Sequence, residues 1–210
     1  MASGPLKASD SAGRRLPGRL LRSFCLTLLA PSLALATDYF VAPTGSVAGD
    51  GSFTSPWNLS AAFAHPPAVQ PGDTIWLRGG TYNGPFTSLL TGAPGLPIVV
   101  RQLPGERATL DYPDPPTQSQ VLLINGSWTW YCGFEITVSR PERINPSAQR
   151  PAGVNVFGPN VKLINLIIHD TYGNGFWTQA QNSEMSGNVI YYSGVTQADR
   201  GHGHGIYSQN

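Results

Sequence analysis

The sequence predicts an all-β protein whose chain winds into stacked coils, a parallel β-solenoid. Among 210 residues there are 24 Gly and 19 Pro, more turn-forming residues than a helical bundle could absorb. Apolar elements also recur in a fixed register through the C-terminal half of the chain. With 40% hydrophobic and 10% aromatic residues, the chain is unlike a disordered protein and can form one sizeable core.

The first 36 residues have the pattern of a secretory signal peptide. Five basic residues come first, the apolar run 24–30 follows, and Ala34-Leu35-Ala36 supplies a small-x-small cleavage site. A disordered basic tail is the alternative. No run of about twenty apolar residues occurs, so a membrane-spanning helix is not expected. We therefore expect an exported protein that is secreted or held in the periplasm or at the cell surface.

Charge and cysteine content exclude several classes of function. The whole chain has a net charge of +1, and removal of the basic leader leaves a slightly acidic domain. Without a basic patch, nucleic acid is not an expected partner. Cys132 is the sole cysteine beyond the leader, so we expect no internal disulfide. We interpret Cys132 as a buried apolar residue rather than a nucleophile, and the protein as a monomer.

Residues 37–73 are expected to cap the solenoid, and residues 74–210 to form its coils. A first strand is predicted over 38–43, and a short helix over 58–65, with Asn58 or Ser60 as its N-cap. This helix would cover an otherwise open end of a sheet. Further strands are predicted over 74–77, 97–101 and 108–111, and Gly79-Gly80 is predicted as a turn.

Two elements repeat from Val121 onward, and they keep one register. The first element pairs an apolar residue with a small or apolar residue two positions later, and its copies lie 32, 22 and 30 residues apart. The second element steps by the same 32 and 22 residues. Copies of the first start at Leu122, Val154, Phe176 and Ile206; copies of the second are Tyr131/Phe134/Ile136, Leu163/Leu166/Ile168 and Met185/Asn188/Ile190. Coils of about 22 residues explain this register, whereas an antiparallel sandwich, which needs hairpin turns, does not.

Longer stretches resemble a known family. The segments DYFVAPTGSVAGDGSFTSPWNLSAAFA and VQPGDTIWLRGGTYNG resemble the opening of the pectate-lyase-like superfamily of right-handed parallel β-helix proteins. TGAPGLPIVVRQLPGERATLDY, LINLIIHDTYGNGFW and GHGHGIYSQN resemble its later coils. The resemblance implies a right-handed parallel β-helix with a short N-terminal capping helix. Members include lyases, hydrolases and epimerases of acidic polysaccharides as well as proteins without known activity, so the fold does not decide the function. Because the chain stops at Asn210 inside an expected strand, we expect a C-terminally truncated β-helix.

The unequal coil lengths place the extra residues on one edge of the solenoid. The insertions fall in 137–152 and 193–203, and both follow the strand that contains Ile136, Ile168 or Ile190. Insertions gathered on one edge commonly form a binding face, although a solvated loop surface is the alternative. The charged and histidine residues of this edge are Arg140, Glu142, Arg143, Arg150, His169, Asp170, Asp199, Arg200, His202 and His204.

The segment from Asp199 to Gly205 is the strongest local candidate for a catalytic or ligand-binding site. Alternation in extended chain places His202 and His204 on one side, where they could act as acid or base, bind a metal, or simply brace the loop. The predicted catalytic residues are Asp170, Arg200, His202 and His204. The predicted substrate-binding residues are Arg140 with the outward, aligned rings of Trp177 and Tyr207, which suit sugar faces unless a loop covers them.

Two mechanisms and one non-enzymatic role remain open. Elimination on a uronic acid needs a cation at the carboxylate and a base, which Arg200 and one of the histidines would supply, with or without calcium on Asp170. Hydrolysis needs two acids, for which Asp170 and Asp199 are candidates. No cofactor is otherwise expected. The predicted function is therefore an exported lyase-like or hydrolase-like protein acting on an acidic polysaccharide; the alternative is a non-catalytic module that binds a cell-surface glycan.

Overall fold

The computed structural model describes residues 1, 4, 35–112, 120–139, 151–194 and 203–209. Residues 35–210 form one compact unit. Within its described part, the chain passes repeatedly through three sheets of short strands, here named A, B and C. The predicted signal peptide lies almost wholly outside the described residues and stays a prediction. No helix in the described part is long and apolar enough to cross a membrane.

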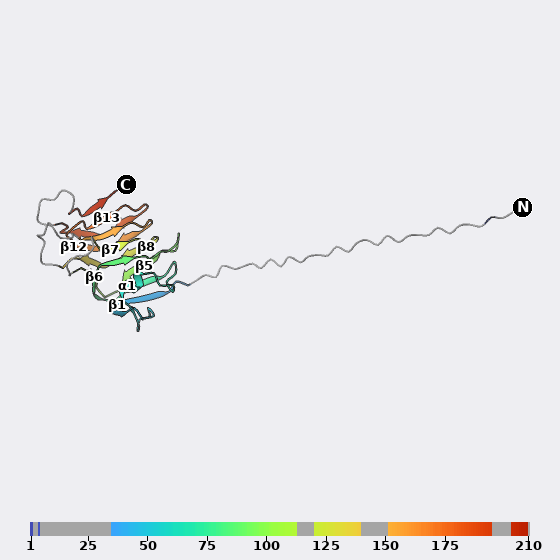
Figure 1. The fold of residues 1–210 in the computed structure, drawn as a ribbon, viewed down its shortest axis with the longest axis horizontal. Coiled ribbons are helices and arrows are strands. Elements are labelled where there is room, and N and C mark those ends of the chain that lie inside the picture. The colour runs from blue at the N-terminus through green and yellow to red at the C-terminus, as the bar shows by residue number, and fades with distance from the viewer. Residues whose placement is uncertain (2–3, 5–34, 113–119, 140–150, 195–202, 210) are drawn as a thin grey trace. The chain divides into compact units, whose positions relative to one another are not determined.

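Each sheet is parallel throughout, and successive coils add one strand to each sheet (Figure 1). Sheet A contains β1 (Asp38–Ser46), β2 (Thr74–Leu77), β5 (Ile98–Gln102), β8 (Thr129–Cys132), β11 (Lys162–Ile164) and β14 (Glu184–Ser186). Sheet B contains β3 (Gly80–Asn83), β6 (Ala108–Asp111), β9 (Glu135–Thr137), β12 (Ile167–His169) and β15 (Val189–Tyr191). Sheet C contains β4 (Phe86–Ser88), β7 (Gln120–Ile124), β10 (Ala152–Val156), β13 (Phe176–Thr178) and β16 (Ile206–Ser208).

The register predicted from the repeats is confirmed. In sheet C, Leu122 pairs with Val154, Val154 with Phe176, and Phe176 with Ile206. In sheets A and B, Leu163 pairs with Tyr131 and Met185, and Ile168 pairs with Ile136 and Ile190. Residues 22, 30 or 32 apart in sequence therefore lie directly above one another, as stacked coils require.

The backbone turns repeat at the same intervals. Between sheets A and B the chain takes a positive φ at Gly133, Asn165 and Gly187. Glycine and asparagine tolerate this conformation best, which explains their choice at these corners. Asn188 lies beside the last of these corners. Its side chain accepts a hydrogen bond from Leu166 N and donates one to Leu163 O, so it connects two neighbouring coils.

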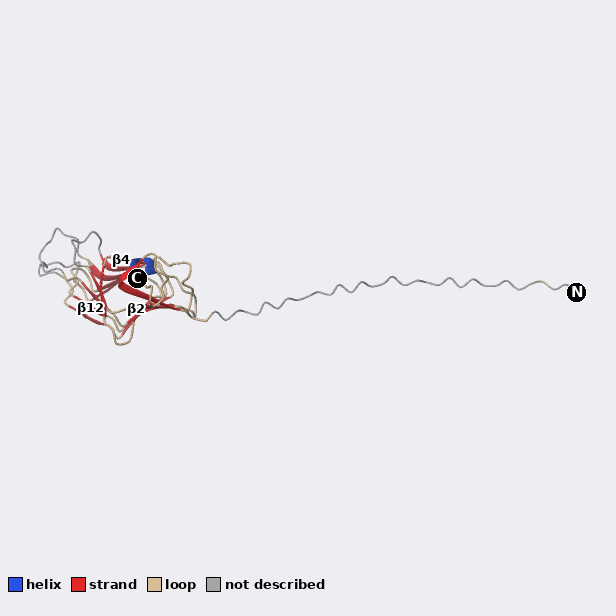
Figure 2. Cartoon of the chain, turned by 90° about the horizontal axis from the view of Figure 1, so that it is seen from below, coloured by secondary structure: helices blue, strands red, loops and turns tan. Residues whose placement is uncertain are grey.

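One apolar interior runs between the three sheets, and α1 (Leu59–Phe63) packs against its first coils. Figure 2 shows β2, β4 and β12, one strand from each sheet, on different sides of this interior. The side chain of Asn58 accepts a hydrogen bond from Ala61 N at 2.8 Å, which confirms Asn58 as the N-cap. Phe63 is fully buried, with its ring edge-on to Phe86 and Tyr131. The predicted capping helix is thus present but shorter than 58–65.

Two details differ from the sequence-based expectations. Gly80 does not simply turn the chain, because it begins β3, and neither β3 nor β4 was predicted. These strands are four and three residues long, and each buries few apolar side chains, so their alternation is too brief to identify from sequence. Ile206 keeps the predicted register but is 58% exposed, because β16 pairs with β13 and with no further described strand.

Candidate functional site

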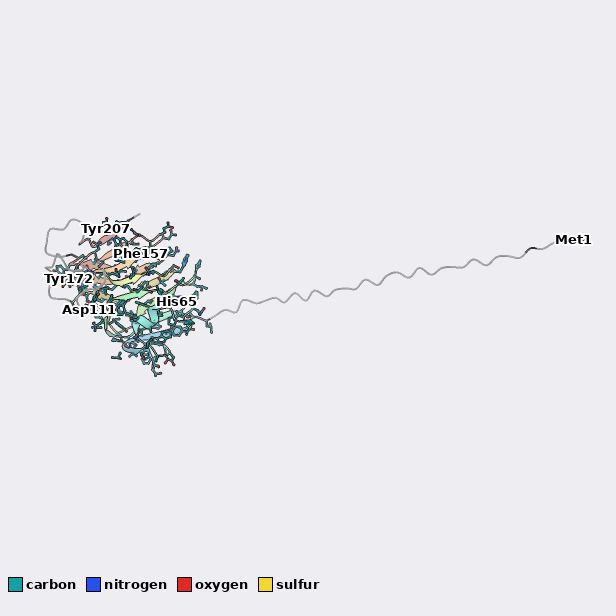
Figure 3. All side chains as sticks on the ribbon, viewed as in Figure 1. Met1, His65, Asp111, Phe157, Tyr172 and Tyr207 are labelled. Carbon is teal, nitrogen blue, oxygen red and sulfur yellow. The ribbon has the colours of Figure 1, made fainter. Side chains whose placement is uncertain are left out.

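The predicted edge lies where the chain passes from sheet B to sheet C. In successive coils, β9 is followed by β10, β12 by β13, and β15 by β16. Since these strands stack in register, the connections between them lie on one edge of the solenoid. Figure 3 labels Asp111, at the end of β6, and Tyr172, in the connection after β12, on this side of the molecule. Arg140, Arg200 and His202 belong to this edge in sequence but lie outside the described residues, as do Glu142, Arg143, Arg150 and Asp199.

A network of charged side chains covers the outer face of sheet B, and His169, the last residue of β12, connects it to this edge. Glu135 is 7% exposed and accepts hydrogen bonds from Arg107 Nε at 3.0 Å and from Thr109 Oγ1 at 2.5 Å. Arg107 also contacts the other carboxylate oxygen through Nη2. Burial by itself would raise the pKa of Glu135, but the hydrogen bonds from Arg107, Thr109 and His169 outweigh it and lower the pKa to about 2. Glu135 is therefore an ionised carboxylate at neutral pH.

His169 connects this network to Asp170. Its Nε2 lies 2.8 Å from Glu135 Oε1, and its Nδ1 lies 2.7 Å from Asp170 Oδ2. The Tyr191 ring stacks on the imidazole with 4.9 Å between the centroids. Asp170 has a φ of 54°, which turns the chain out of β12 and directs the carboxylate back to His169. This arrangement fixes both residues in place.

An aromatic strip lies on the outer face of sheet C, beside the same edge. Trp177 and Tyr207 are register partners in β13 and β16, as the alternation predicted, and both side chains are partly exposed. The ring of Phe157 packs edge-on against Trp177 at 4.9 Å, and the ring of His204 stacks on Tyr207 at 5.3 Å. Figure 3 labels Phe157 and Tyr207, which are two coils apart because β13, the strand of Trp177, lies between β10 and β16. We name these four residues the sheet C strip.

The backbone holds His204 at the end of the strip. Its N–H donates to Asn174 Oδ1 at 3.1 Å, and its carbonyl accepts from Gly175 N at 2.9 Å. Asn174 is 8% exposed, so its amide provides a fixed support. Asp170 opens the same connection that Asn174 closes. Asp170 and His204 are the two predicted catalytic residues that the structure describes. The connection that begins at Asp170 supports the His204 backbone through Asn174, but the Asp170 side chain itself contacts His169.

Glycine lies close to the start of β10, β13 and β16, and at the first two of these strands it lets sheets B and C approach closely. A Cβ on Gly153 would lie 2.5 Å from Ile168 Cγ2, and one on Gly175 would lie 2.5 Å from Ile190 Cγ2. Both isoleucines point into the core from sheet B. At Gly153 and Gly175, the close approach of sheets B and C is therefore sufficient to explain the repeated glycine, and no contact with a ligand is needed to explain it.

The structure also tests the remaining interpretations. Among the described residues, no three or more His, Cys, Asp or Glu side chains are grouped to hold a metal ion. Cys132 is half-buried on the outer face of sheet A rather than in the core. Burial raises the pKa of its thiol against the lowering effect of Arg101, which leaves a poor nucleophile.

Sequence reasoning missed Glu135, Arg107 and Phe157. Glu135 precedes Ile136 of the repeat, so alternation could have placed it on the outer face of sheet B. Phe157 follows the repeated Val154/Val156 pair in the same way. Arg107 lies outside the repeated segment, and no sequence signal pairs it with Glu135, 28 residues away.

The three parallel sheets and their stacked strands define a parallel β-helix. Residues 39–205 match the family described as Pel9A-like, right handed beta helix region. The chain therefore belongs to this family, and the right-handed parallel β-helix predicted from the sequence is confirmed.

Two relatives that match part of the chain are pectate lyases. Pectate lyase L of Dickeya dadantii (strain 3937) is 33% identical over 131 residues, which cover 56% of this chain and 30% of that protein. The match to pectate lyase L of Dickeya chrysanthemi has the same identity and extent. The chain thus spans about a third or less of the length of these relatives.

Solved structures share the fold at lower identity. Pectate lyase Pel9A superposes with a TM-score of 0.51 at 24% identity, over 75% of this chain and 48% of that one. An alginate lyase from Paenibacillus sp. str. FPU-7 superposes with a TM-score of 0.61 at 20% identity, over 83% and 50%. A GH136 lacto-N-biosidase from Eubacterium ramulus gives 0.58 at 18% identity, over 72% and 34%. At these identities the likeness concerns the fold alone.

Proposed function

We propose that this protein is an exported polysaccharide lyase that acts on a uronate-containing glycan. The sheet C strip carries the proposal, because stacked aromatic rings beside a loop edge rich in cations suit a chain of acidic sugars. The identity with pectate lyase L supports the choice of an acidic glycan. The pattern of the first 36 residues supports export.

In the proposed reaction the sugar rings lie on Trp177 and Tyr207. Arg140 and Arg200 bind the uronate carboxylate, and their charge stabilises the electrons that accumulate when the neighbouring carbon loses its proton. His202 or His204 takes that proton. The electron pair then forms a carbon–carbon double bond, and the glycosidic oxygen leaves with its bonding electrons and is protonated. No water is consumed, and one product carries an unsaturated uronate.

Asp170 has a positioning role in this proposal. Its carboxylate holds His169, and its connection ends at Asn174, which supports the His204 backbone. The hydrolase role that needs Asp170 as a free acid receives less support, because its carboxylate contacts His169 at 2.7 Å.

The test incubates the full-length protein with polygalacturonate, alginate and a neutral galactan. The expected result is ultraviolet absorbance from an unsaturated uronate with one of the two acidic polymers. New reducing ends without that absorbance would identify a hydrolase. Binding without either product would identify the non-catalytic module, and all three outcomes use one set of reactions.

A further inference from the structure

Sheet A carries a second group of aromatic and basic side chains, on a different side of the β-helix from the sheet C strip (Figure 2). Trp76 of β2 pairs with Arg101 of β5, and Trp130 of β8 pairs with Lys162 of β11. Alternation assigns these four residues to the outer face, because their neighbours Ile75, Val100, Tyr131 and Leu163 are buried in the core. We name these four residues the sheet A face.

Each tryptophan of this face has a cation from the next coil placed over its ring. The Arg101 guanidinium carbon lies 5.0 Å from the centroid of the Trp76 ring, and Lys162 Nζ lies 5.2 Å from that of Trp130. These are cation–π distances. The same contact that orients each cation also holds it beside an aromatic surface. Each tryptophan–cation pair therefore places an apolar ring surface and a positive charge about 5 Å apart.

The two platforms are separated by the strand β5. Successive strands in a sheet lie about 4.8 Å apart, so Trp76 and Trp130 are about 10 Å apart along the stack. Sugars two positions apart in a polysaccharide chain can therefore contact the two rings when the chain runs along the helix axis. The cations alternate with the rings in the same direction, so every second carboxylate of a uronate polymer can lie near a cation.

The two cations of this face lie on inner strands of sheet A, where a ligand carboxylate can pair with them. Arg101 is exposed and forms no salt bridge among the described residues. Lys162 pairs with Glu184 at 2.6 Å, but both side chains are well exposed, at 36% and 52%, so a ligand carboxylate can compete for the lysine. In the same columns Asp38 of β1 and Glu184 of β14 are acidic, but they lie on the two outermost strands, and the partners on the strands between them, Thr74, Val99, Cys132 and Ile164, carry no acidic group.

Trp76 adds a second observation. Its Nε1 is buried and has no hydrogen-bond partner. A buried donor without an acceptor is unfavourable, and most native structures avoid it. If Arg101 moves from the Trp76 ring to a ligand carboxylate, the indole face and its N–H become available to the sugar. Ligand binding would then satisfy the donor that the free protein leaves unpaired.

We propose that the sheet A face is a second binding site, which holds a uronate polysaccharide away from the reacting edge. The choice of ligand rests on the proposed function, whereas the existence of the site rests on the four side chains of sheet A. Such a site would increase the residence of the protein on an insoluble or long polymer without taking part in bond cleavage. Its effect should vanish on short oligosaccharides, which cannot span both faces.

The test measures polygalacturonate binding by affinity electrophoresis of the full-length protein, together with lyase turnover on a short oligogalacturonate. Replacing both rings, Trp76→Ala with Trp130→Ala, should weaken binding to the polymer about tenfold. Arg101→Ala should weaken it and reduce its salt dependence, whereas Arg101→Lys should retain most of it. Turnover on the oligosaccharide should not change. Trp130→Phe keeps a ring and should bind nearly as well as the wild type.

The outcomes separate this site from the proposed function. Unchanged polymer binding in the double variant would overturn the sheet A site even if cleavage is normal. Weakened binding in a protein that cleaves no uronate would support the site and overturn the lyase. A wild-type protein that neither binds nor cleaves any uronate polymer would overturn both. Thermal unfolding of each variant identifies any loss of binding that follows from loss of the fold.

Discussion

Replacing Glu135 by Gln tests the charged network on sheet B, because the change removes one negative charge and keeps the shape of the side chain. In the wild type, this carboxylate accepts hydrogen bonds from Arg107, Thr109 and His169. The neutral amide leaves the arginine and the histidine facing a much weaker acceptor. We expect Glu135→Gln to destabilise the fold at neutral pH.

The size of the effect follows from the pKa of Glu135. A glutamate that titrates at 4.5 when unfolded and at about 2 when folded gains ~3 kcal/mol of folding free energy when ionised. The folded pKa is the lower one, so this stabilisation is complete above pH 4.5 and disappears as the pH falls through 2. Arg107 is 70% exposed, and solvent screens its charge, so we expect a loss of about 1 to 3 kcal/mol at pH 7.

Urea unfolding of wild type and variant at pH 7, 5 and 3 measures the difference in unfolding free energy. The difference should be largest at pH 7 and should shrink toward pH 3. Glu184→Gln is the matched control, because its partner Lys162 forms an exposed ion pair that is worth about 0.5 kcal/mol or less. A difference for Glu135→Gln that is the same at pH 7 and pH 3 would refute the assignment of the stabilisation to its ionised form.

Three further predictions concern the edge and the strip. Gly175→Ala should cost about 1 to 3 kcal/mol in urea unfolding, because the new Cβ would lie 2.5 Å from a core isoleucine. Gly205→Ala, where the same isoleucine is 3.7 Å away, should be nearly neutral, and equal losses would contradict the argument. His204→Ala should reduce lyase turnover steeply with little change in melting temperature. The control His65→Asn changes a histidine far from the edge in sequence and should leave turnover unchanged. Matched losses of stability and turnover in His204→Ala would show that His204 supports the loop instead of taking part in the reaction. Trp177→Ala should weaken oligogalacturonate binding about tenfold, and unchanged binding would exclude the strip as a sugar platform.

The repeats made most of the fold predictable. Leu122, Val154 and Phe176 recur because each fills the same place in successive coils, so their spacing reports both coil length and register. β3 was not predicted, because a four-residue strand with one buried side chain, Tyr82, shows almost no alternation of apolar and polar residues. Its place is decided by pairing with β6.

The candidate site was predictable in position and only partly in detail. The unequal intervals between repeats identified the edge, and alternation placed Trp177 and Tyr207 together. The sequence did not indicate that His169 would take both Asp170 and Glu135 as partners, or that Phe157 would join the strip. Those contacts depend on which side chains of neighbouring coils turn toward one another.

By itself, the sequence determined the class of fold, the stacking register and the edge on which the loops gather. These properties depend on periodicity, because each coil must bury the same apolar positions against the next. The tertiary structure alone decided the pairing of Glu135 with Arg107, the support of His204 by Asn174, and the placement of Arg101 over Trp76. These contacts join residues from 25 to 30 positions apart, and their geometry depends on side-chain directions that a one-dimensional pattern does not contain.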